Sequence, residues 1–294
     1  KPFNSEVGGV FYLNAPKSGL FVPALDHCAI IQKGTKIGDI VDPLTGTVLA
    51  TLTAPNNGIL FTLREYPVVY EGSLIARIFG VNSGTIKNLT LDFNDNVSVI
   101  GKDYVGALVG KNRGIISSIK VYSRYGQVEA KNIGGGLVGQ NYGTISDASV
   151  NIRVNRTADN NNKNHGARNI GGLVGENLGT IQNSDSSGAV RGQYNIGGLV
   201  GHNIGDIINS VSSGEVRSTA GDSVLNIYNI GGLVGQNRGT ITSSNVYADL
   251  GESSGSFIHG INIGGLVGDN IGTINNSNAF GNVLGTGRVI GGLV

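Results

Sequence analysis

The chain has 294 residues, of which 49 are glycine and 6 are proline, with 21 basic and 20 acidic side chains. This composition lacks the proline of collagen and the low hydrophobicity of a disordered linker, and its balanced charge gives no basic footprint for nucleic acid or an anionic membrane. The apolar runs are far shorter than the roughly 18 residues of a membrane-spanning segment. We therefore expect short apolar strands joined by tight turns, with no nucleic-acid partner and no membrane span.

Residues 14–78 contain two halves with related sequences. "APKSGLFVP" corresponds to "APNNGILFT", and "IIQKGTKIGDI" corresponds to "VVYEGSLIARI". Each half predicts a pair of short strands, and the pseudo-twofold pattern is that of a small, flattened biotinyl- or lipoyl-like β-barrel over residues 1–78. A swinging-arm domain would carry a modified lysine between the halves, but residues 41–48 read "VDPLTGTV". We therefore predict no carrier function and no cofactor.

This segment resembles the C-terminal β-domain of the succinylglutamate desuccinylase and aspartoacylase family, which are zinc-dependent amide hydrolases. The resemblance implies the fold alone, because the metal ligands and catalytic glutamate of that family lie in a preceding domain and no His-x-x-Glu occurs in this chain. A zinc site needs three or four convergent ligands. The histidines stand isolated in the sequence, at His27, His165, His202 and His259. We expect no catalytic residue and no metal site.

Two pairs of residues in this segment could suggest chemistry. His27 and Cys28 are neighbours on a predicted strand and so face opposite sides, and a lone cysteine in an apolar strand is more often buried than nucleophilic. Asp39 and Asp42 lie in a turn context and are predicted to be caps or solvated charges. Neither pair is expected to be catalytic.

A second acidic pair, Asp92 and Asp95, follows the first predicted coil. Its loop context again predicts caps or solvated charges, although weak calcium binding at Asp92, Asn94 and Asp95 stays open. The calcium-binding nonapeptide Gly-Gly-x-Gly-x-Asp of toxin-type β-rolls does not occur in the sequence.

From Phe79 onward the chain repeats the core Gly-Leu-Val-Gly-x-Asn-x-Gly-x-Ile. The shared leucine recurs at intervals of 29, 36, 26, 34, 33 and 27 residues between Leu108 and Leu293. A constant core with a variable spacer is typical of stacked structural units that carry surface loops of unequal length. We predict an all-β chain in which residues 79–294 form a right-handed parallel β-helix, or β-solenoid, of about seven repeats cut off at its C-terminal end.

Two columns of side chains are expected to hold these coils together. Each asparagine should hydrogen-bond to the next copy and satisfy backbone groups that the turn leaves open. The leucines should lie above one another in the core, and the flanking glycines should permit close backbone approach and turns with positive φ. The predicted ladder residues are Asn112, Asn141, Asn177, Asn203, Asn237, Asn270, Leu137, Leu173, Leu199, Leu233 and Leu266.

The phrase "IGGLVGxNxGTIxNS" resembles the GLUG-type repeat of bacterial surface proteins, which include large adhesins and the N-terminal regions of IgA-cleaving metallopeptidases. Over residues 79–294 the resemblance implies a secreted or cell-surface bacterial protein without catalytic activity. We therefore predict an adhesin or fibre stalk. Its expected ligand is a host glycan or protein bound by the loops 155–169 or 217–229. Further repeats or self-association are expected at the last coil.

Other functions stay open at this stage. The chain could be a non-catalytic accessory region of a secreted metallopeptidase, or of a zinc-dependent amide hydrolase without its catalytic domain. Ice binding through a column of threonines at positions 85, 144, 180, 240 and 273 is disfavoured, because Ile115 and Asp206 interrupt the column and each coil offers a single threonine.

Overall fold

The computed structural model divides the chain into two compact units, residues 1–81 and 82–294, whereas the predicted boundary lies after residue 78. In the described residues every regular element is a β-strand, and none of their segments is a helix able to cross a membrane. The residues that the structure describes are 6–7, 10–26, 29–31, 34–55, 58–82, 84–93, 98–156, 168–218, 229–248, 250, 262–285 and 289–294.

Unit 1 consists of antiparallel strands that share one apolar core. One sheet has the order β6 (Val48–Thr53), β5 (Lys36–Val41), β3 (Gly19–Pro23) and β8 (Val68–Val69). The other strands pair in the order β1 (Glu6–Val7), β2 (Val10–Asn14), β9 (Leu74–Asn82), β7 (Gly58–Leu63) and β4 (Ala29–Ile31). Fully buried side chains from both groups of strands include Phe21, Ile37, Ile40, Leu60 and Ile75.

The two halves of unit 1 exchange their short strands. β4 of the first half pairs with β7 of the second, and β8 of the second half pairs with β3 of the first. Both pairings are antiparallel, as are β3 with β5 and β7 with β9. The internal sequence similarity therefore has a counterpart in reciprocal strand pairing, while closure of these strands into a barrel stays a prediction.

Both aspartates of the first predicted pair accept local hydrogen bonds. Asp42 Oδ1 accepts from the backbone N–H groups of Leu44 at 2.8 Å and Thr45 at 3.0 Å, and these bonds lower the pKa of Asp42. Asp39 lies 2.6 Å from Lys36 Nζ and accepts a hydrogen bond from Thr51. Their polar atoms are therefore engaged in the turn and on the sheet surface.

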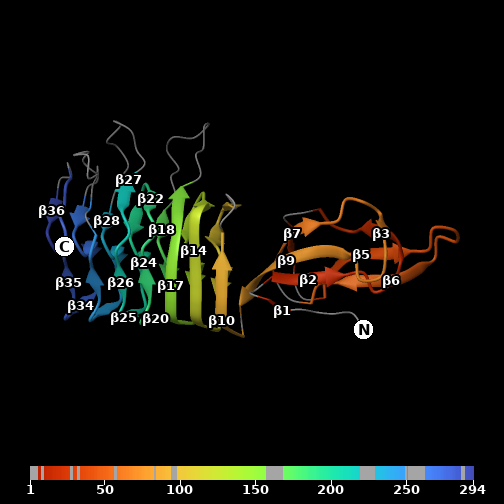
Figure 1. Cartoon of the computed structure of the whole chain (residues 1–294), viewed down its shortest axis with the longest axis horizontal. Coiled ribbons are helices and arrows are strands. Elements are labelled where there is room, and N and C mark those ends of the chain that lie inside the picture. Colours follow the sequence, from red (N-terminus) through yellow and green to blue (C-terminus); the bar gives the residue numbers. More distant parts are fainter. Residues whose placement is uncertain are drawn as a thin grey trace. The chain divides into compact units, whose positions relative to one another are not determined.

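Unit 2 is a parallel β-solenoid in which each coil contributes strands to three sheets (Figure 1). Sheet 1 contains β12 (Tyr104–Gly106), β15 (Ile133–Gly135), β18 (Asn169–Gly171), β23 (Asn195–Gly197), β28 (Asn229–Gly231), β32 (Asn262–Gly264) and β36 (Val289–Gly291). Within unit 2, sheet 2 contains β13 (Val109–Asn112), β16 (Val138–Asn141), β19 (Val174–Asn177), β24 (Val200–Asn203), β29 (Val234–Asn237) and β33 (Val267–Asn270).

The strands of sheet 3 are long in the early coils and short in the later ones. Its early strands are long and continuous: β10 (Thr85–Asp92), β14 (Ile115–Ala130) and β17 (Thr144–Arg156), with β11 (Ser98–Gly101) beside β14. Later coils have short strands: β20 (Thr180–Gln182), β21 (Asp185–Ser186), β22 (Val190–Gly192), β25 (Asp206–Ile208), β26 (Val211–Ser212), β27 (Val216–Ser218), β30 (Thr240–Thr242), β31 (Asn245–Val246), β34 (Thr273–Asn275) and β35 (Asn278–Ala279).

A buried serine accounts for the interrupted strands. Ser184 Oγ donates to the carbonyl of Gln182 at 2.8 Å and accepts the backbone N–H of Ala148 at 3.2 Å. Its hydroxyl thus takes the place of a backbone group where the strand breaks. Ser210 and Ser244 repeat this arrangement in the following coils. The sequence interpretation missed this column, although "Asn-Ser" follows the second apolar segment in several copies.

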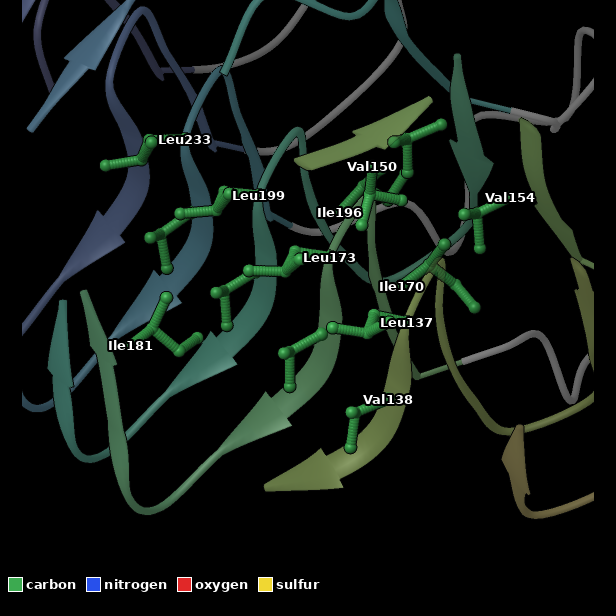
Figure 2. Close-up of a cluster of buried hydrophobic side chains, with 14 of the residues drawn as sticks. Leu137, Val138, Val150, Val154, Ile170, Leu173, Ile181, Ile196, Leu199 and Leu233 are labelled. Carbon is green, nitrogen blue, oxygen red and sulfur yellow. The ribbon is translucent and has the colours of Figure 1, made fainter. Parts of the chain in front are cut away.

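The apolar core runs through the whole stack of coils. Leu137 N donates to Leu173 O at 2.9 Å, and Leu173 N donates to Leu199 O at the same distance, so these backbones lie directly above one another. Figure 2 shows the leucine side chains in a row that continues to Leu233. Leu137, Leu173, Leu199, Leu233 and Leu266 are all completely buried. Each coil therefore provides an apolar surface on which the next one packs.

One residue in each coil has a left-handed backbone, and it is not a glycine. These residues have φ between 47° and 56°, and they are Asn88, Ser118, Asp147, Asn183, Asn209, Ser243 and Asn276. The prediction that the glycines of the repeated core make positive-φ turns is wrong. Among described glycines, positive φ occurs outside that core, at Gly34, Gly46, Gly72 and Gly281.

The core glycines are required for close approach instead. A Cβ on Gly175 would lie 2.7 Å from Ile133 Cγ2 and 2.8 Å from the carbonyl oxygen of Gly139. These distances are shorter than van der Waals contact, so an alanine would push neighbouring coils apart.

Candidate functional site

Two rows of asparagines run along unit 2, and the first is buried except at its last member, Asn270. In this first amide ladder each Nδ2 donates to the Oδ1 of the asparagine in the next coil, at 2.7 to 2.8 Å. From Asn112 onward each Nδ2 also donates to the glycine carbonyl two residues ahead. The first amide ladder consists of Asn82, Asn112, Asn141, Asn177, Asn203, Asn237 and Asn270. It closes the turns between sheets 2 and 3.

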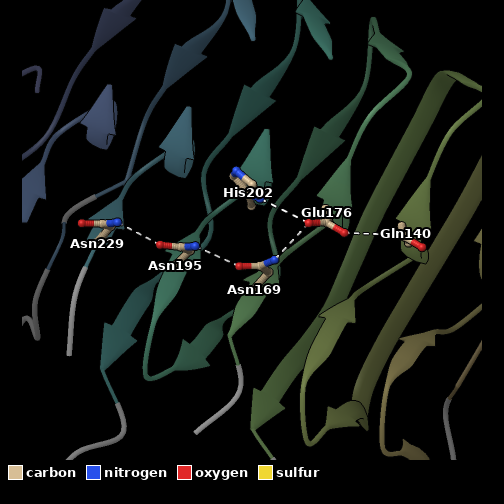
Figure 3. A network of polar contacts seen from close by, with 6 residues as sticks. All are labelled: Gln140, Asn169, Glu176, Asn195, His202 and Asn229. Atoms are coloured by element: carbon tan, nitrogen blue, oxygen red, sulfur yellow. Dashed lines mark hydrogen bonds and ion pairs between the residues drawn. The ribbon is translucent and has the colours of Figure 1, made fainter. Parts of the chain in front are cut away.

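The second amide ladder lies on sheet 1 and points the opposite way. Asn262 Nδ2 donates to Asn229, Asn229 donates to Asn195, and Asn195 donates to Asn169, each at 2.9 Å. Figure 3 shows three of these amides in line. The row starts at Asn169 because the preceding coil has Ile133 at the equivalent position, which offers no side-chain acceptor.

Glu176 lies where the second amide ladder ends (Figure 3). Its Oε1 accepts from Asn169 Nδ2 at 3.4 Å and lies 3.2 Å from His202 Nδ1, and its Oε2 accepts from Gln140 Nε2 at 2.6 Å. The hydrogen bond from His202 is the largest influence lowering the pKa of Glu176, with further lowering from Gln140 and from the charge of Lys111. These donors outweigh the burial that opposes ionisation.

This arrangement favours a fixed, ionised carboxylate over an acid–base pair. Both oxygens of Glu176 already accept hydrogen bonds, so neither is poised to take a proton from a substrate. Gln140 Oε1 and His202 Nε2 are buried and have no hydrogen-bond partner in the described residues. Within those residues no cluster of three or more His, Cys, Asp or Glu side chains could hold a metal ion.

Two cations lie over tyrosine rings beside this network. Lys111 Nζ is 3.7 Å from the centroid of the Tyr104 ring, and the guanidinium of Arg113 is 5.8 Å from that of Tyr142. Burial lowers the pKa of Lys111, as does the charge of Arg113, and burial raises the pKa of Tyr104. Both tyrosines remain exposed at the surface.

The connection from sheet 3 to sheet 1 varies in length between coils, while the sheets themselves keep their register. Residues 131–132 and 193–194 make it in two coils. In two other coils this connection comprises residues 157–168 and 219–228. The strands that precede these longer connections end in register with the strands that precede the short ones. The strand ends that bracket the longer connections therefore lie at the same corner of the solenoid as those that bracket the short ones.

The interiors of the predicted loops 155–169 and 217–229 lie outside the described residues, and the bounds of both loops need correction. Asn155 and Arg156 belong to β17, where they pair with β14, and Asn169 begins β18. Arg217 and Ser218 likewise belong to β27, and Asn229 begins β28. Periodic apolar residues end before the pairing does, because the last residues of these strands are polar.

Other sequence candidates are separated from one another or lie outside the described residues. The candidates that lie outside the described residues are His27, Cys28, Asn94, Asp95, His165 and His259. Asp92 accepts a hydrogen bond from the hydroxyl of Tyr122 at 2.9 Å. The threonine column is in register but includes Ile115 and Asp206, as expected; its members are Thr85, Thr144, Thr180, Thr240 and Thr273.

Sequence reasoning missed the polar column beside the first amide ladder. The residue before each ladder asparagine varies between copies in the sequence, yet the strand register stacks these residues in one row. The row consists of Lys111, Gln140, Glu176, His202, Gln236 and Asp269. Their fixed offset from the asparagine is a signal that could have identified them.

The GLUG motif matches the chain twice, at residues 166–191 and 192–217. These coils are GLUG repeats. Other coils of unit 2 share the GLUG phrase and pair in the same register, whereas no curated protein matches the chain. The GLUG match lies wholly within unit 2, so the resemblance of residues 1–78 to the succinylglutamate desuccinylase and aspartoacylase family has no further support and stays a prediction.

Proposed function

We propose that this chain is a non-catalytic bacterial surface or secreted protein, in which the GLUG solenoid is a stalk and its side binds a host glycan or protein. The observation that carries the proposal is the contrast between a regular interior and a variable corner. The first amide ladder continues from Asn82 to Asn270 without a break. Insertions occur where sheet 3 passes to sheet 1.

The regular interior suits a rod that bears load along its axis. From β13 to β33 each coil is joined to the next by backbone hydrogen bonds in three sheets and by amides of the first ladder. Stability in such a stack comes from interfaces between neighbouring repeats, so the structure can be lengthened without a new core. A stalk that holds a binding surface away from a cell needs this property.

The variable corner suits recognition. Residues 157–168 and 219–228 replace connections that other coils make with residues 131–132 and 193–194. Because the short connections suffice to close a coil, the longer ones are not needed for folding. On solenoids, insertions of this kind commonly form the binding side.

A binding screen with shortened connections tests the proposal. In one variant residues 157–168 are replaced by the Lys-Asn sequence of residues 131–132, and in the other residues 219–228 are replaced by the Gln-Tyr sequence of residues 193–194. Both variants should keep the β-type circular dichroism spectrum, and at least one should lose binding to a glycan array or to immobilised host proteins. Equal binding by the wild type and both variants would contradict a role for this corner.

An assay for hydrolysis tests the non-catalytic part separately. The chain should not hydrolyse an N-acyl amino acid, with or without added zinc. Zinc-dependent turnover that survives purification to homogeneity would contradict the proposal.

A further inference from the structure

Two cations near one end of unit 2 form no direct ion pair within the described residues, although the charges of Glu176 and Asp103 act on Lys111. Lys111 and Arg113 flank the ladder residue Asn112 and lie close enough for their charges to interact. In the described residues neither has a carboxylate within 4.0 Å, and their side chains lie over the rings of Tyr104 and Tyr142. Two like charges held together at a surface favour an anionic ligand.

Nearby carboxylates are already engaged elsewhere. Asp103 accepts from Asn132 Nδ2 at 2.5 Å, and Glu176 accepts from Asn169, Gln140 and His202. Rotation of these acids toward Lys111 would break those hydrogen bonds. Direct ion pairing by Lys111 and Arg113 is thus left for an external carboxylate, while the charges of Glu176 and Asp103 still act on Lys111.

The tyrosines determine which kind of anion fits. The side chains of Tyr104 and Tyr142 are 36% and 45% exposed, and each offers an apolar ring surface with a hydroxyl at its edge. A sugar ring has an apolar C–H face and a rim of hydroxyl groups, so it can pack on such a ring and hydrogen-bond to its hydroxyl. Arginine beside the ring can bind a carboxylate in two-point fashion.

We propose that Tyr104, Lys111, Arg113 and Tyr142 form a binding site for an acidic saccharide, whose carboxylate lies between the two cations and whose ring packs on Tyr142. This inference rests on the proposed function, because it names a ligand class for the side of the stalk. The site belongs to the coils themselves and not to the variable corner. The saccharide site can therefore be refuted without refuting ligand binding by residues 157–168 or 219–228.

The experiment is titration calorimetry of the full chain with sialyllactose and with tetragalacturonate, which carry the carboxylate in different sugars. At least one should bind, and lactose should bind about tenfold more weakly or worse because it lacks the charge. A Lys111→Gln/Arg113→Gln variant should lose about tenfold or more in affinity for the same ligand. Tyr142→Ala should also weaken binding, because it removes the packing surface.

Arg238→Gln is the matched control. Arg238 occupies the position of Arg113 four coils further along, directly after a ladder asparagine, and it is exposed. Its replacement should leave binding unchanged. If the double variant does not fold, Arg113→Gln alone carries the test, because that side chain is exposed.

Three results would overturn the inference. These are no binding of either acidic saccharide, equal affinity for lactose, and undiminished binding by the cation variants. Equal binding of a polyglutamate peptide would also overturn it, since charge alone would then explain the affinity. Host-glycan binding that depends only on residues 157–168 or 219–228 would refute this site and leave the proposed function standing.

Discussion

Asn169 donates its side-chain amide to Glu176, so that the second amide ladder ends on a carboxylate. Hydrogen-bonded amides in a row polarise one another, and the donor end of such a row is favourably terminated by a negative charge. Three further asparagines stand behind Asn169, each donating toward it. Glu176 thereby connects the amides of sheet 1 to Gln140 and His202 on sheet 2.

The stability of unit 2 should depend on pH through Glu176. Hydrogen bonds from His202 and Gln140 hold the pKa of Glu176 below its ordinary value of 4.5 in the folded chain. As the pH falls, Glu176 is therefore protonated at a higher pH in the unfolded chain than in the folded chain. The stabilisation is fully present above the ordinary pKa and is lost as the pH falls through the lowered one.

Urea unfolding from about pH 7 to about pH 3 measures this effect. Glu176→Gln should be less stable than the wild type at neutral pH, and the gap should narrow at acidic pH. Asp206→Asn, at an exposed carboxylate of the same unit, is the control for the loss of one negative charge. A constant gap between Glu176→Gln and the wild type across this range would refute the assignment.

Ser184 and Ser186 should respond in opposite directions to replacement by alanine. Ser184 Oγ makes two hydrogen bonds to buried backbone groups, so Ser184→Ala should cost about 1–3 kcal/mol by leaving them unsatisfied. Ser186 Oγ is buried without a hydrogen-bond partner in the described residues, so Ser186→Ala should be neutral or stabilising by up to about 1 kcal/mol. Thermal unfolding distinguishes the two. Equal destabilisation by both variants would show that Ser186 has a partner.

The parts of the fold that repeat in the sequence could be predicted from it. A constant phrase at irregular intervals required stacked coils, and Ile, Leu and Val at constant offsets indicated which side chains are buried. The network around Glu176 was not predictable in this way. Glu176 and His202 occupy the same repeat position, which varies between copies, and their contact depends on strand register across a 26-residue coil.

The turns show a different limit of sequence reasoning. Glycine-rich phrases favoured glycine as the left-handed residue, but Asn183 and its equivalents have that conformation. The glycines serve close packing between coils, a constraint between residues far apart in sequence. A glycine in the sequence does not by itself reveal whether it is required for a left-handed backbone or for close packing between coils.

Asn183 should therefore tolerate glycine but not a β-branched residue. Its φ of 48° is accessible to asparagine and glycine, whereas valine would be strained by roughly 1–2 kcal/mol. The exposed side chain makes only a 3.4 Å hydrogen bond to Asp147, so its loss matters little. Thermal unfolding should show Asn183→Gly near the wild type and Asn183→Val clearly below it. The reverse order would contradict a left-handed backbone at this position.

Asn177 should be among the most sensitive residues of the solenoid. It is completely buried, its Oδ1 accepts from Asn141 at 2.8 Å, and its Nδ2 donates to Asn203 at 2.8 Å and to Gly179 at 3.1 Å. Asn177→Ala would leave donors and acceptors unpaired in two adjacent coils, where water cannot replace the lost bonds. Since each such group costs about 1–3 kcal/mol, we expect a loss of roughly 3 kcal/mol or more.

Asn278 provides the comparison for Asn177. It also donates to an asparagine of a neighbouring coil, Asn245, at 3.1 Å, but at an exposed position. Water can satisfy the exposed partners, so Asn278→Ala should cost no more than about 0.5 kcal/mol. Urea unfolding of both variants measures the difference. Similar losses would mean that the amide ladders stabilise the coils by pairing alone, whereas a large loss confined to Asn177 would show that burial gives the first amide ladder its strength.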